Sequence, residues 1–339
     1  MENGKGKATI RDVARHAGVS IATVSRYLNR SGSVDEETGL RIDEAVKAMQ
    51  YAPSMAARSL KTKRNPIVLL VVPDICNPFY SGMAKYVQRL VGEHGYAMML
   101  YNTNGEQKEE EAAVRMVSRM NADGVLFASI NANESVLAML QQLSTQVVWL
   151  NAYEDRFDSV CVSRRGGTFL AAQHLIELGH KRIAFAGGSP NSTIGKNRRE
   201  GYECALTESG LLLSGEYRFE MGFSQEDGYK AGCYFSVMAD QITAICCAND
   251  LIALGVMDAL QAHGIRVPED ISVTGMDDIP YARTVNPQLT TVTNDSAIFA
   301  REGVKMLFER IEGRTEGPAR RIAIEHELVV RASSAAPCQ

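Results

Sequence analysis

From Ile67 onward, short apolar runs rich in β-branched residues alternate with segments whose apolar residues recur at helical spacing. The predicted strands are IVLLVV (67–72), AMMLYN (97–102), GVLFASI (124–130), VVWLNA (147–152), RIAFAGG (182–188), TAICCAN (243–249) and ISVTGM (271–276). The predicted helices cover residues 79–94, 106–120, 133–143, 167–178, 197–209 and 250–263. This alternation predicts parallel sheets with helices on both faces, and the strands are too many for one small sheet. We therefore expect an α/β fold with two Rossmann-like lobes.

The region before these strands has a different pattern. Residues 8–51 carry helix-period apolar residues and no convincing strand, and the short segment PSMAARSLKTKRNP follows, bracketed by Pro53 and Pro66. A chain of 339 residues is long enough for two or three domains. We expect a helical domain at 1–52, a linker at 53–64 and a large α/β domain at 65–339.

Charge is unevenly spread along the chain. Residues 1–64 hold 12 of the 36 lysines and arginines but only 7 of the 40 acidic residues, so the remainder is net acidic. A basic segment on an acidic body predicts that only the N-terminal part binds a polyanion, because the body would repel it.

The cysteine pattern and the N-terminus bear on location. The seven cysteines have no regular spacing and lie mostly in apolar runs, which favours reduced thiols over a disulfide framework. The sequence MENGKGKATI lacks the apolar stretch of a signal peptide, and the run 67–72 is far shorter than the roughly 20 residues that cross a bilayer. We expect a cytoplasmic protein with no membrane partner.

Residues 10–28 predict a helix-turn-helix. Val13, Ala14 and Ala17 would form the inner face of a first helix, and Gly18 would allow the sharp turn that follows. Ser20 is a good N-cap for a second helix that begins near Ile21. Val24 and Leu28 would then face inward, and a third helix is expected at 35–50.

The outward residues of the second helix are the predicted DNA readers. Ile21 and Ala22 can meet base edges, and Arg26 can reach guanine O6 and N7 one turn later. The remaining candidates suit phosphate contacts, which position the protein without specifying sequence; they are Ser20, Thr23, Ser25 and Asn29. We therefore expect double-stranded operator DNA as a partner.

The stretch ATIRDVARHAGVSIATVSRYLN resembles the N-terminal signature of the LacI/GalR family of bacterial transcription regulators. The similarity continues, in the order of the family, through QYAPSMAARSLKTKRN, VVPDICNPFY, HLIELGHKRIAFAGG, CANDLIALGV, GIRVPEDISVTGMDD and PQLTTV. It covers nearly the whole chain. The first motif is highly specific, whereas the later ones are specific mainly in combination.

The resemblance implies a hinge helix in the linker. In the family, two such helices pair in the minor groove, where a leucine at the position of Leu60 wedges between base pairs. Arg58 would supply positive charge nearby. A segment of this length is too short to form a stable helix alone, so it would fold on docking. An ordinary linker is the alternative.

The resemblance also implies the architecture of the body. An N-terminal all-α helix-turn-helix DNA-binding domain would precede a two-lobed periplasmic-binding-protein type I (Rossmann-like) effector domain. The lobes would be discontinuous, with 65–161 and 294–320 in the first, and 162–293 and 321–333 in the second. An effector would lie in the cleft, beyond the carboxyl ends of the strands.

Polar and aromatic residues near predicted strand ends are the effector-binding candidates. Asp277 can accept two hydroxyl or amine hydrogen bonds, Arg198 lies near a helix start, and Asn249 ends TAICCAN. Phe79 and Phe223 can present flat faces to a sugar or base ring. By resemblance, the family's pocket draws on all five positions. Phe79, Phe223 and Asp277 also have structural readings, and Asp250 could cap the next helix.

Residues 163 and 164 depart from the family pattern. Many members carry Asp-Asn there, whereas this chain has Ser163 and Arg164. Arg164 would suit a carboxylate or phosphate on the effector, or it would point to solvent. The effector therefore stays open among a sugar, sugar acid, sugar phosphate and nucleoside.

No CxxC, HExxH or GxSxG motif occurs, so we expect no catalytic residues, no metal site, no cofactor and no enzyme activity. The prediction is a homodimeric transcriptional regulator, more often a repressor than an activator, controlled by a small molecule. A catabolite-control regulator with a phosphorylated carrier protein as corepressor is one alternative. A solute-binding protein for transport is another.

Overall fold

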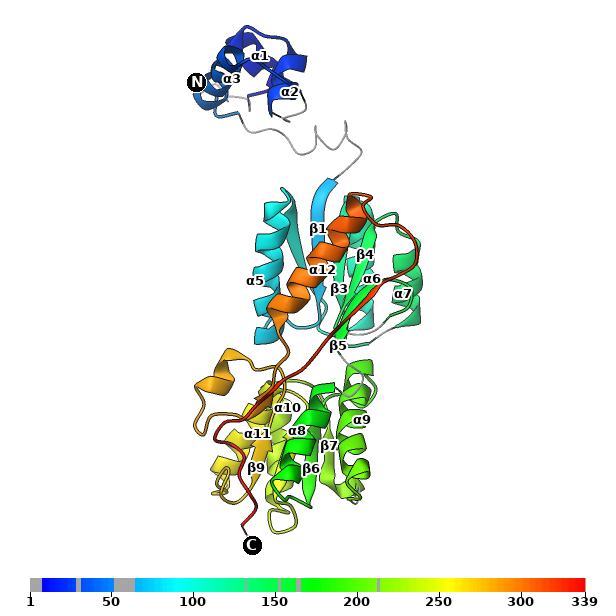
Figure 1. Ribbon diagram of the computed structural model, residues 1–339, viewed down its shortest axis with the longest axis vertical. Helices are drawn as coiled ribbons and strands as arrows, with labels where there is room; N and C mark the ends of the chain where they lie inside the picture. Colours follow the sequence, from blue (N-terminus) through cyan, green and yellow to red (C-terminus); the bar gives the residue numbers. More distant parts are fainter. Residues whose placement is uncertain are drawn as a thin grey trace, which may run out of the picture. The chain divides into compact units, whose positions relative to one another are not determined.

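A computed structural model describes the protein at residues 8–28, 32–51, 65–131, 133–151, 154–162, 166–211 and 214–338. The chain forms two compact units, Met1–Asn65 and Pro66–Gln339 (Figure 1). We call the first unit the head and the second the body. The whole predicted linker, residues 53–64, lies outside the described residues.

The head contains α1 (Ile10–Ala17), α2 (Ile21–Leu28) and α3 (Glu36–Ala48). Gly18 ends α1 in the left-handed conformation, with a φ of 65°, as its place in the predicted turn requires. Val13, Ala14, Ala17 and Val24 are buried with Ile42 and Ala45 of α3. The predicted inner faces thus form one small core. A capping box of Thr9 and Asp12, absent from the prediction, starts α1.

The first lobe of the body is built on a six-stranded sheet in the order β11-β5-β4-β3-β1-β2. Its strands are β1 (Asn65–Val72), β2 (Ala97–Asn102), β3 (Ala122–Ala128), β4 (Gln146–Leu150), β5 (Asp158–Val162) and β11 (Arg321–Ile324). Its helices are α5 (Pro78–Glu93), α6 (Gln107–Met120), α7 (Glu134–Gln141) and α12 (Ser296–Ile311). Neighbouring strands that pair β1–β2, β3–β4, β4–β5 and β5–β11 are parallel.

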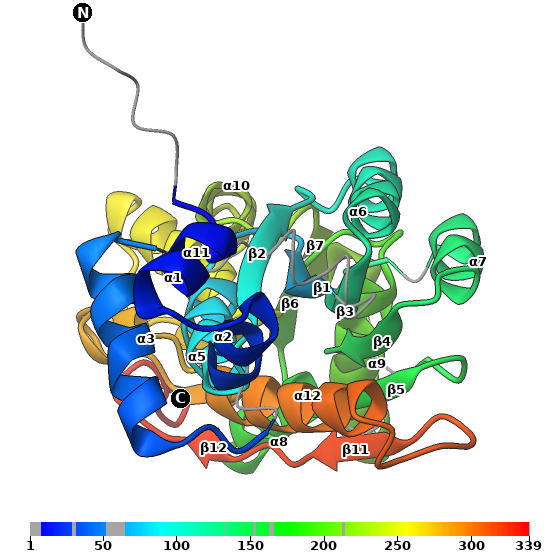
Figure 2. The ribbon, with the colours of Figure 1, turned by 90° about the horizontal axis from the view of Figure 1, so that it is seen from above.

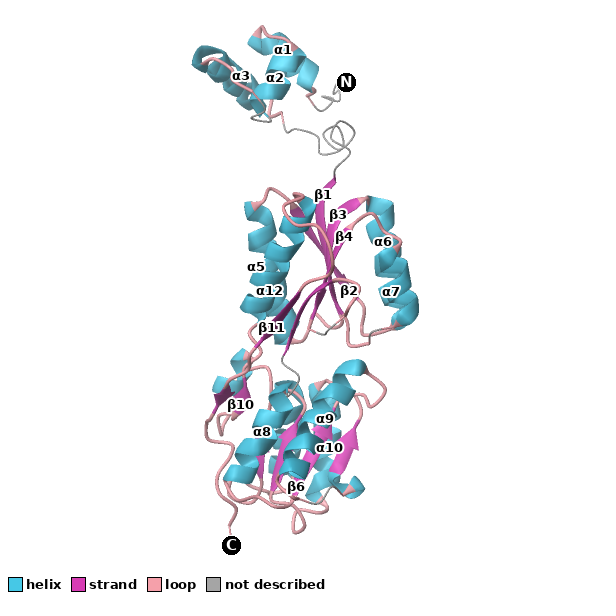
Figure 3. Ribbon diagram, turned by 45° about the vertical axis from the view of Figure 1, so that its right-hand side comes forward, coloured by secondary structure: helices cyan, strands magenta, loops and turns pink. Residues whose placement is uncertain are grey.

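The two faces of this sheet carry separate cores. Val68, Leu70 and Val72 of β1 pack with α5 and α12, whereas Leu69 and Val71 pack with α6 and α7. Alternate residues of a strand point to opposite faces, so an uninterrupted apolar run such as β1 serves both cores. Figures 2 and 3 show α5 and α12 on one side of the sheet and α6 and α7 on the other.

The second lobe has a four-stranded parallel sheet in the order β7-β6-β8-β9. Its strands are β6 (Ile183–Gly187), β7 (Arg218–Glu220), β8 (Ala244–Cys247) and β9 (Ser272–Thr274). Its helices are α8 (Gly166–Glu177), α9 (Thr193–Glu208), α10 (Gln225–Ser236) and α11 (Asp250–Ala262), with short 3₁₀ turns at Gly215–Tyr217 and Pro280–Arg283. The lobe is thus a smaller version of the same α/β design.

The chain passes between the lobes after β5, before α12 and after β11. Beside the second lobe, β10 (Thr291–Val292) and β12 (Leu328–Val329) form an antiparallel pair. The prediction that residues 321–333 belong to the second lobe is wrong for β11, because Arg321–Ile324 pair with β5 in the first lobe's sheet. The segment 321–333 contains two short strands in different sheets, β11 and β12, separated by the residues that cross between the lobes.

The start of α9 also differs from the prediction. The helix begins at Thr193 rather than Asn197, because the Ser192 hydroxyl accepts a hydrogen bond from the Gly195 amide at 2.9 Å and caps it. Arg198 consequently lies in the second turn of α9, not at its start.

Candidate nucleic-acid interface and ligand cleft

The N-terminal end of α2 presents a free surface. The Ser20 hydroxyl accepts the Thr23 amide at 3.1 Å, so this residue is the cap that its position predicts. Ile21, an apolar side chain, is 45% exposed, and Ala22 and Arg26 are exposed beside it, whereas Thr23 and Ser25 are half-buried. An exposed helix start with a guanidinium one turn later is suited to insertion in a major groove.

Tyr27 fixes how α2 crosses α3, and sequence reasoning missed it. A Cβ at Gly39 would lie 2.7 Å from the Tyr27 ring, so only glycine admits the ring there. The Tyr27 hydroxyl donates to Asp43 Oδ2 at 2.7 Å. This contact holds the exposed face of α2 in a fixed orientation within the head.

Several predicted site residues lie outside the described residues, and the structure says nothing of them. They are Asn29, Arg58 and Leu60 among the DNA-binding candidates, and Ser163 and Arg164 among the effector-binding candidates.

A cavity of about 400 Å³ lies between the two lobes of the body. The first lobe contributes residues that include Asp74, Phe79, Tyr80 and Ile130, and the second lobe contributes Ile194, Arg198, Phe223, Asp227, Asn249 and Asp277. The structure thus brings five of the seven predicted effector-binding residues around one space. We call this space the cleft.

An ion pair of Arg198 and Asp277 forms the polar centre of the cleft. Arg198 Nη2 lies 3.3 Å from Asp277 Oδ1, and Nη1 donates to the Ala248 carbonyl oxygen at 2.6 Å. Asn294 Nδ2 donates to the same Asp277 Oδ1 at 3.0 Å. Burial raises the pKa of the Asp277 carboxyl above its usual range, although Arg198 and Asn294 oppose this. Of the side chains that the structure describes, none donates to Oδ2, which leaves that oxygen for a ligand.

Phe223 provides an apolar wall from the second lobe. Its ring lies beneath the Arg198 guanidinium, whose central carbon is 5.8 Å from the ring centroid. A Cβ at Gly188 would stand 2.1 Å from the ring, so glycine makes room for it. Asn249 Nδ2 donates to the Phe223 carbonyl oxygen at 3.0 Å, and Asn249 Oδ1 caps α11 by accepting the Ile252 amide. The Asn249 side chain is therefore engaged by protein groups, although it lines the cleft.

Phe79 lines the cleft and is also part of the first lobe's hydrophobic core. Only 4% of it is exposed, and its ring packs edge-on against Phe299 and Tyr80, with centroids 5.8 and 4.9 Å away. Both readings that the sequence allows thus apply to this residue, since its exposed edge lines the cleft while most of the ring stabilises the first lobe.

Sequence reasoning missed several residues at the cleft. Asn151 Nδ2 lies 3.4 Å from the Tyr80 hydroxyl, and burial raises the pKa of that phenol. Asp74 and Asp227 line the cavity as two further carboxylates. Asp74 comes two residues after β1, and Asn151, which lines a hollow that adjoins the cleft, directly follows β4. The rule that ligands lie beyond carboxyl strand ends could therefore have found both residues.

A second hollow of about 380 Å³ adjoins the cleft and shares Ile194 and Arg198 with it. Asn151, Cys161 and Arg321 line it from the first lobe. Between the two spaces, the Ile194 amide donates across the lobes to the Ile130 carbonyl oxygen at 3.3 Å. The Ile194 side chain is buried among first-lobe apolar residues. Ile194 is thus a direct contact that holds the lobes together.

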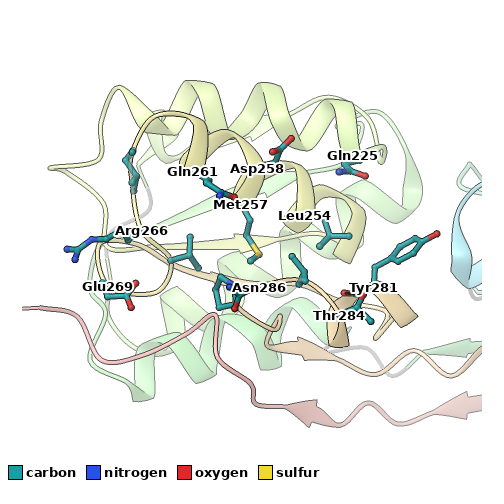
Figure 4. A pocket seen from close by; sticks show the side chains of 15 residues that line it. Gln225, Leu254, Met257, Asp258, Gln261, Arg266, Glu269, Tyr281, Thr284 and Asn286 are labelled. Carbon is teal, nitrogen blue, oxygen red and sulfur yellow. Dashed lines mark hydrogen bonds between the residues drawn. The ribbon is translucent and has the colours of Figure 1, made fainter.

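Another hollow, of about 750 Å³, is a groove on the second lobe alone (Figure 4). It runs between α11 and the segment 264–287, with Leu254 and Met257 at its base. Asp258 and Tyr281, at its edge, are exposed to solvent. Ligand sites combine apolar walls with a few buried, convergent polar groups. The cleft has these features, and the groove does not.

In the parts of the chain that the structure describes, no three His, Cys, Asp or Glu side chains converge as metal ligands. Within the same residues, no helix has both the length and the apolar character that a bilayer requires.

Two family descriptions match the chain, namely "Bacterial regulatory proteins, lacI family" at residues 9–54 and "Periplasmic binding protein-like domain" at residues 172–334. The HTH-type transcriptional repressor PurR of Haemophilus influenzae (strain PittEE) is 34% identical, over 96% of this chain and 98% of the relative. PurR of Aliivibrio salmonicida (strain LFI1238) is also 34% identical, with the same coverage.

Two solved structures of bacterial regulators are similar to this chain over nearly its whole length. The transcriptional regulator CelR–cellobiose complex is 30% identical, with a TM-score of 0.73 over 96% of this chain and 99% of that one. The Lac repressor dimer bound to operator and the anti-inducer ONPF has a TM-score of 0.87 over 98% of this chain and 100% of that one, at 24% identity. The latter likeness concerns the fold.

These findings confirm the predicted architecture, a helical DNA-binding unit followed by a two-lobed α/β unit of the periplasmic-binding-protein kind. They also confirm the predicted class of function, a transcriptional regulator that binds DNA. The chain belongs to the LacI family of bacterial regulatory proteins.

Proposed function

We propose that this regulator represses transcription as a cytoplasmic homodimer whose affinity for operator DNA is set by a neutral, polyhydroxylated effector, a sugar, bound in the cleft. The observation that carries the effector assignment is the buried pair of Arg198 and Asp277 in a cavity that Phe79 and Phe223 also line. We infer that the protein binds its effector without transforming it.

The head supports operator binding through α2. Ile21 and Ala22 are exposed where the helix begins, and Arg26 is exposed one turn on. In a major groove, the first two would contact base edges, including thymine methyl groups, and Arg26 would donate to guanine. Residues 1–64 hold 12 Lys and Arg against 7 Asp and Glu, so phosphate attraction adds to this recognition. Leu60 and Arg58 remain our candidates for a minor-groove contact.

The charge balance of the cleft supports a neutral effector. Among the described residues that line it, Arg198 is the cation, whereas Asp74, Asp227 and Asp277 are acidic. Both terminal nitrogens of Arg198 already donate, one to Asp277 and one to the Ala248 carbonyl oxygen. A carboxylate or phosphate would meet net negative charge and an occupied guanidinium, which costs binding energy in a buried site.

The walls of the cleft support a sugar in particular. Carboxylate oxygens such as Asp277 Oδ2 accept from hydroxyl groups. Phe223 offers a flat apolar surface to the C–H face of a pyranose ring, and the exposed edge of Phe79 adds an apolar contact. A volume of about 400 Å³ is in the usual range for small ligands. The 30%-identical regulator CelR, whose structure contains cellobiose, supports the same class. A neutral sugar would not require Arg164.

The test is thermal unfolding of the full-length protein against neutral sugars, sugar acids, sugar phosphates and nucleosides. A ligand at 100 times its dissociation constant stabilises the folded state by about 2.7 kcal/mol. We expect a shift with a neutral sugar that is lost in Asp277→Asn and kept in the groove variant Asp258→Asn. A shift only with phosphorylated or carboxylated compounds would contradict the neutral class. A change in operator affinity with the active compound then tests effector control.

A further inference from the structure

The residue that faces the effector has an unusual backbone. Asp277 and the next residue, Asp278, have φ angles of 113° and 46°. Positive φ is unfavourable for residues other than glycine, and it persists only where surrounding contacts enforce it. Something must therefore hold the turn 276–279 in the shape that directs Asp277 at the cleft.

Asp250 binds this turn at both ends. Its amide donates to the Met276 carbonyl oxygen at 2.8 Å, and its Oδ2 accepts the Ile279 amide at 2.8 Å. Its Oδ1 accepts the hydroxyl of Thr291 on β10. The strained turn is thus held to the start of α11 and to a strand next to the crossover between lobes.

These contacts leave Asp250 without the role that its sequence position suggests. It is the first residue of α11, but Asn249 caps that helix by accepting the Ile252 amide at 2.8 Å. Asp250 is fully buried, and a Cβ on Gly275 would stand 2.3 Å from its Oδ1. Burying a carboxylate costs free energy, and here a glycine is also needed to make room for it. Helix capping does not explain why Asp250 is placed there.

The arginines near Asp250 form ion pairs with other carboxylates. Asp278 takes Arg283 and Arg331 as ion-pair partners, and Asp277 takes Arg198. Burial, reinforced by the nearby Asp277, raises the pKa of Asp250 well above its usual range. Asp250 therefore works through directed hydrogen bonds from an amide and a hydroxyl, rather than through a counter-ion.

We propose that Asp250 is the positioning residue for effector recognition, because it holds the 276–279 turn so that Asp277 faces the cleft. The inference rests on the proposed function, in which Asp277 is the acceptor for the effector. Asp250 itself touches no ligand. Its removal should disturb the turn first, and effector affinity as a result.

The first experiment needs no effector. Hydrogen–deuterium exchange of the full-length Asp250→Asn variant should show exchange at least tenfold faster in peptides that contain Ile279, with peptides of β6 and α9 unchanged. The matched control is Asp258→Asn on the exposed side of α11, which should exchange like the native protein. Native-like protection of Ile279 in Asp250→Asn would overturn the proposal. Should that variant not fold, Thr291→Val, which removes one of the two side-chain bonds, is measured instead and should show the same local increase.

The second experiment measures cellobiose binding by calorimetry. Introduced alone, Asp250→Asn should weaken cellobiose binding at least tenfold. Introduced into a protein that already carries Asp277→Asn, it should have little further effect on cellobiose binding. An undiminished loss in that background would show that Asp250 acts independently of Asp277 and would overturn the proposal. If cellobiose does not bind the native protein, this sugar fails as the effector, and the exchange result alone decides the role of Asp250.

Discussion

At the scale of single residues, burial changes the ionisation of Glu110. It lies on α6, fully buried; Ser129 donates to its Oε1, and its Oε2 has no partner among the described residues. Burial raises the pKa of this carboxyl to about 7. Because the folded value exceeds the usual one near 4.5, the protonated form is favoured in the fold. That contribution is complete below pH 4.5 and is lost as the pH rises through 7.

Glu110→Gln, which mimics the protonated acid, should therefore stabilise the protein at high pH alone. We expect a gain of about 1–3 kcal/mol at pH 8, on the basis of about 1.4 kcal/mol per unit of pKa shift, and almost none at pH 5. Urea unfolding at both values measures it. The exposed residue change Glu316→Gln is the control and should have no pH-dependent effect. An equal gain at both pH values would contradict the assigned ionisation.

Arg26 provides the residue-scale test of DNA recognition. Arg26→Ala should weaken operator binding by about 1–3 kcal/mol and relax the preference at one base pair, because a guanidinium that bonds guanine is lost. Competition binding against single-base operator variants measures both effects. Arg15→Ala, on the exposed side of α1, should lower affinity slightly and equally for all sequences. An equal loss on random DNA from Arg26→Ala would refute direct readout.

For the effector-binding candidates, the sequence predicted where each side chain lies better than it predicted what each side chain does. Asp277 could be placed at the cleft because it directly follows the predicted strand 271–276, and Arg198 because the family resemblance puts its position in the pocket. Asn249 and Phe79 were placed there too, yet the first caps α11 and holds Phe223, and the second packs against Phe299. For Asp250 the sequence leaves capping of the next helix open as one role, and its hydrogen-bond network could not be predicted because it depends on the distant residues 279 and 291.

At the scale of elements, one carboxylate joins three of them. Asp158 on β5 is buried and accepts from Arg310 of α12 at 2.8 Å and from Arg320, next to β11, at 2.7 Å. Burial alone would raise the pKa of Asp158, but these arginines outweigh it and hold the pKa below its usual value. The resulting stabilisation is present above about pH 4 and is lost as the pH falls through the folded pKa.

Asp158→Asn should accordingly destabilise the body at pH 7. Removing one partner of a buried pair costs about 3–5 kcal/mol. Because Arg320 is about a third exposed, we expect about 2–3 kcal/mol here. Urea unfolding gives the value, and Asp270→Asn, which breaks the exposed pair with Arg266, should leave the midpoint nearly unchanged. Similar losses in the two variants would show that burial of the Asp158 cluster does not matter.

Element types followed from the apolar period, but element ends did not. The period of two and the period of 3.6 distinguish β1 from α5 without tertiary information. The early start of α9 depends on one capping hydroxyl, and the division of 322–331 into β11 and β12 depends on which sheet each half joins. Such partners are set by contacts far apart in sequence, which local periodicity does not contain.

For the body as a whole, buried histidines set the response to acid. His174, His180 and His326 all have pKa values lowered from 6.5, chiefly by burial. His180 Nε2 donates to the Ala335 carbonyl oxygen at 2.8 Å, which holds the C-terminal segment against the second lobe. A histidine with a lowered folded pKa is stabilising above its usual pKa, and the contribution is lost as the pH falls below about 6.5.

The contribution of these histidines to the free energy of unfolding should therefore fall between pH 6.5 and pH 5, opposite in sign to the contribution of Glu110. His180→Gln should make this dependence shallower by up to about 1.4 kcal/mol per pH unit, because one titrating group is removed. Urea titrations at four pH values measure the slope. His263→Gln, at an exposed position in the same lobe, should leave the slope unchanged. A steeper dependence in His180→Gln would mean that His180 is protonated in the fold.

The crossings between lobes carry a consequence for synthesis. The first lobe begins the body, but α12 and β11, which complete its core and its sheet, come after the whole second lobe in sequence. The second lobe's four-stranded sheet, by contrast, comes from one continuous stretch. While the chain is being synthesised, the apolar residues of β3 and β4 that α12 covers stay uncovered, whereas the later lobe can already fold. Domains usually fold in the order in which they are translated. In this body the order would be reversed, with the earlier lobe incomplete until α12 and β11 have been synthesised.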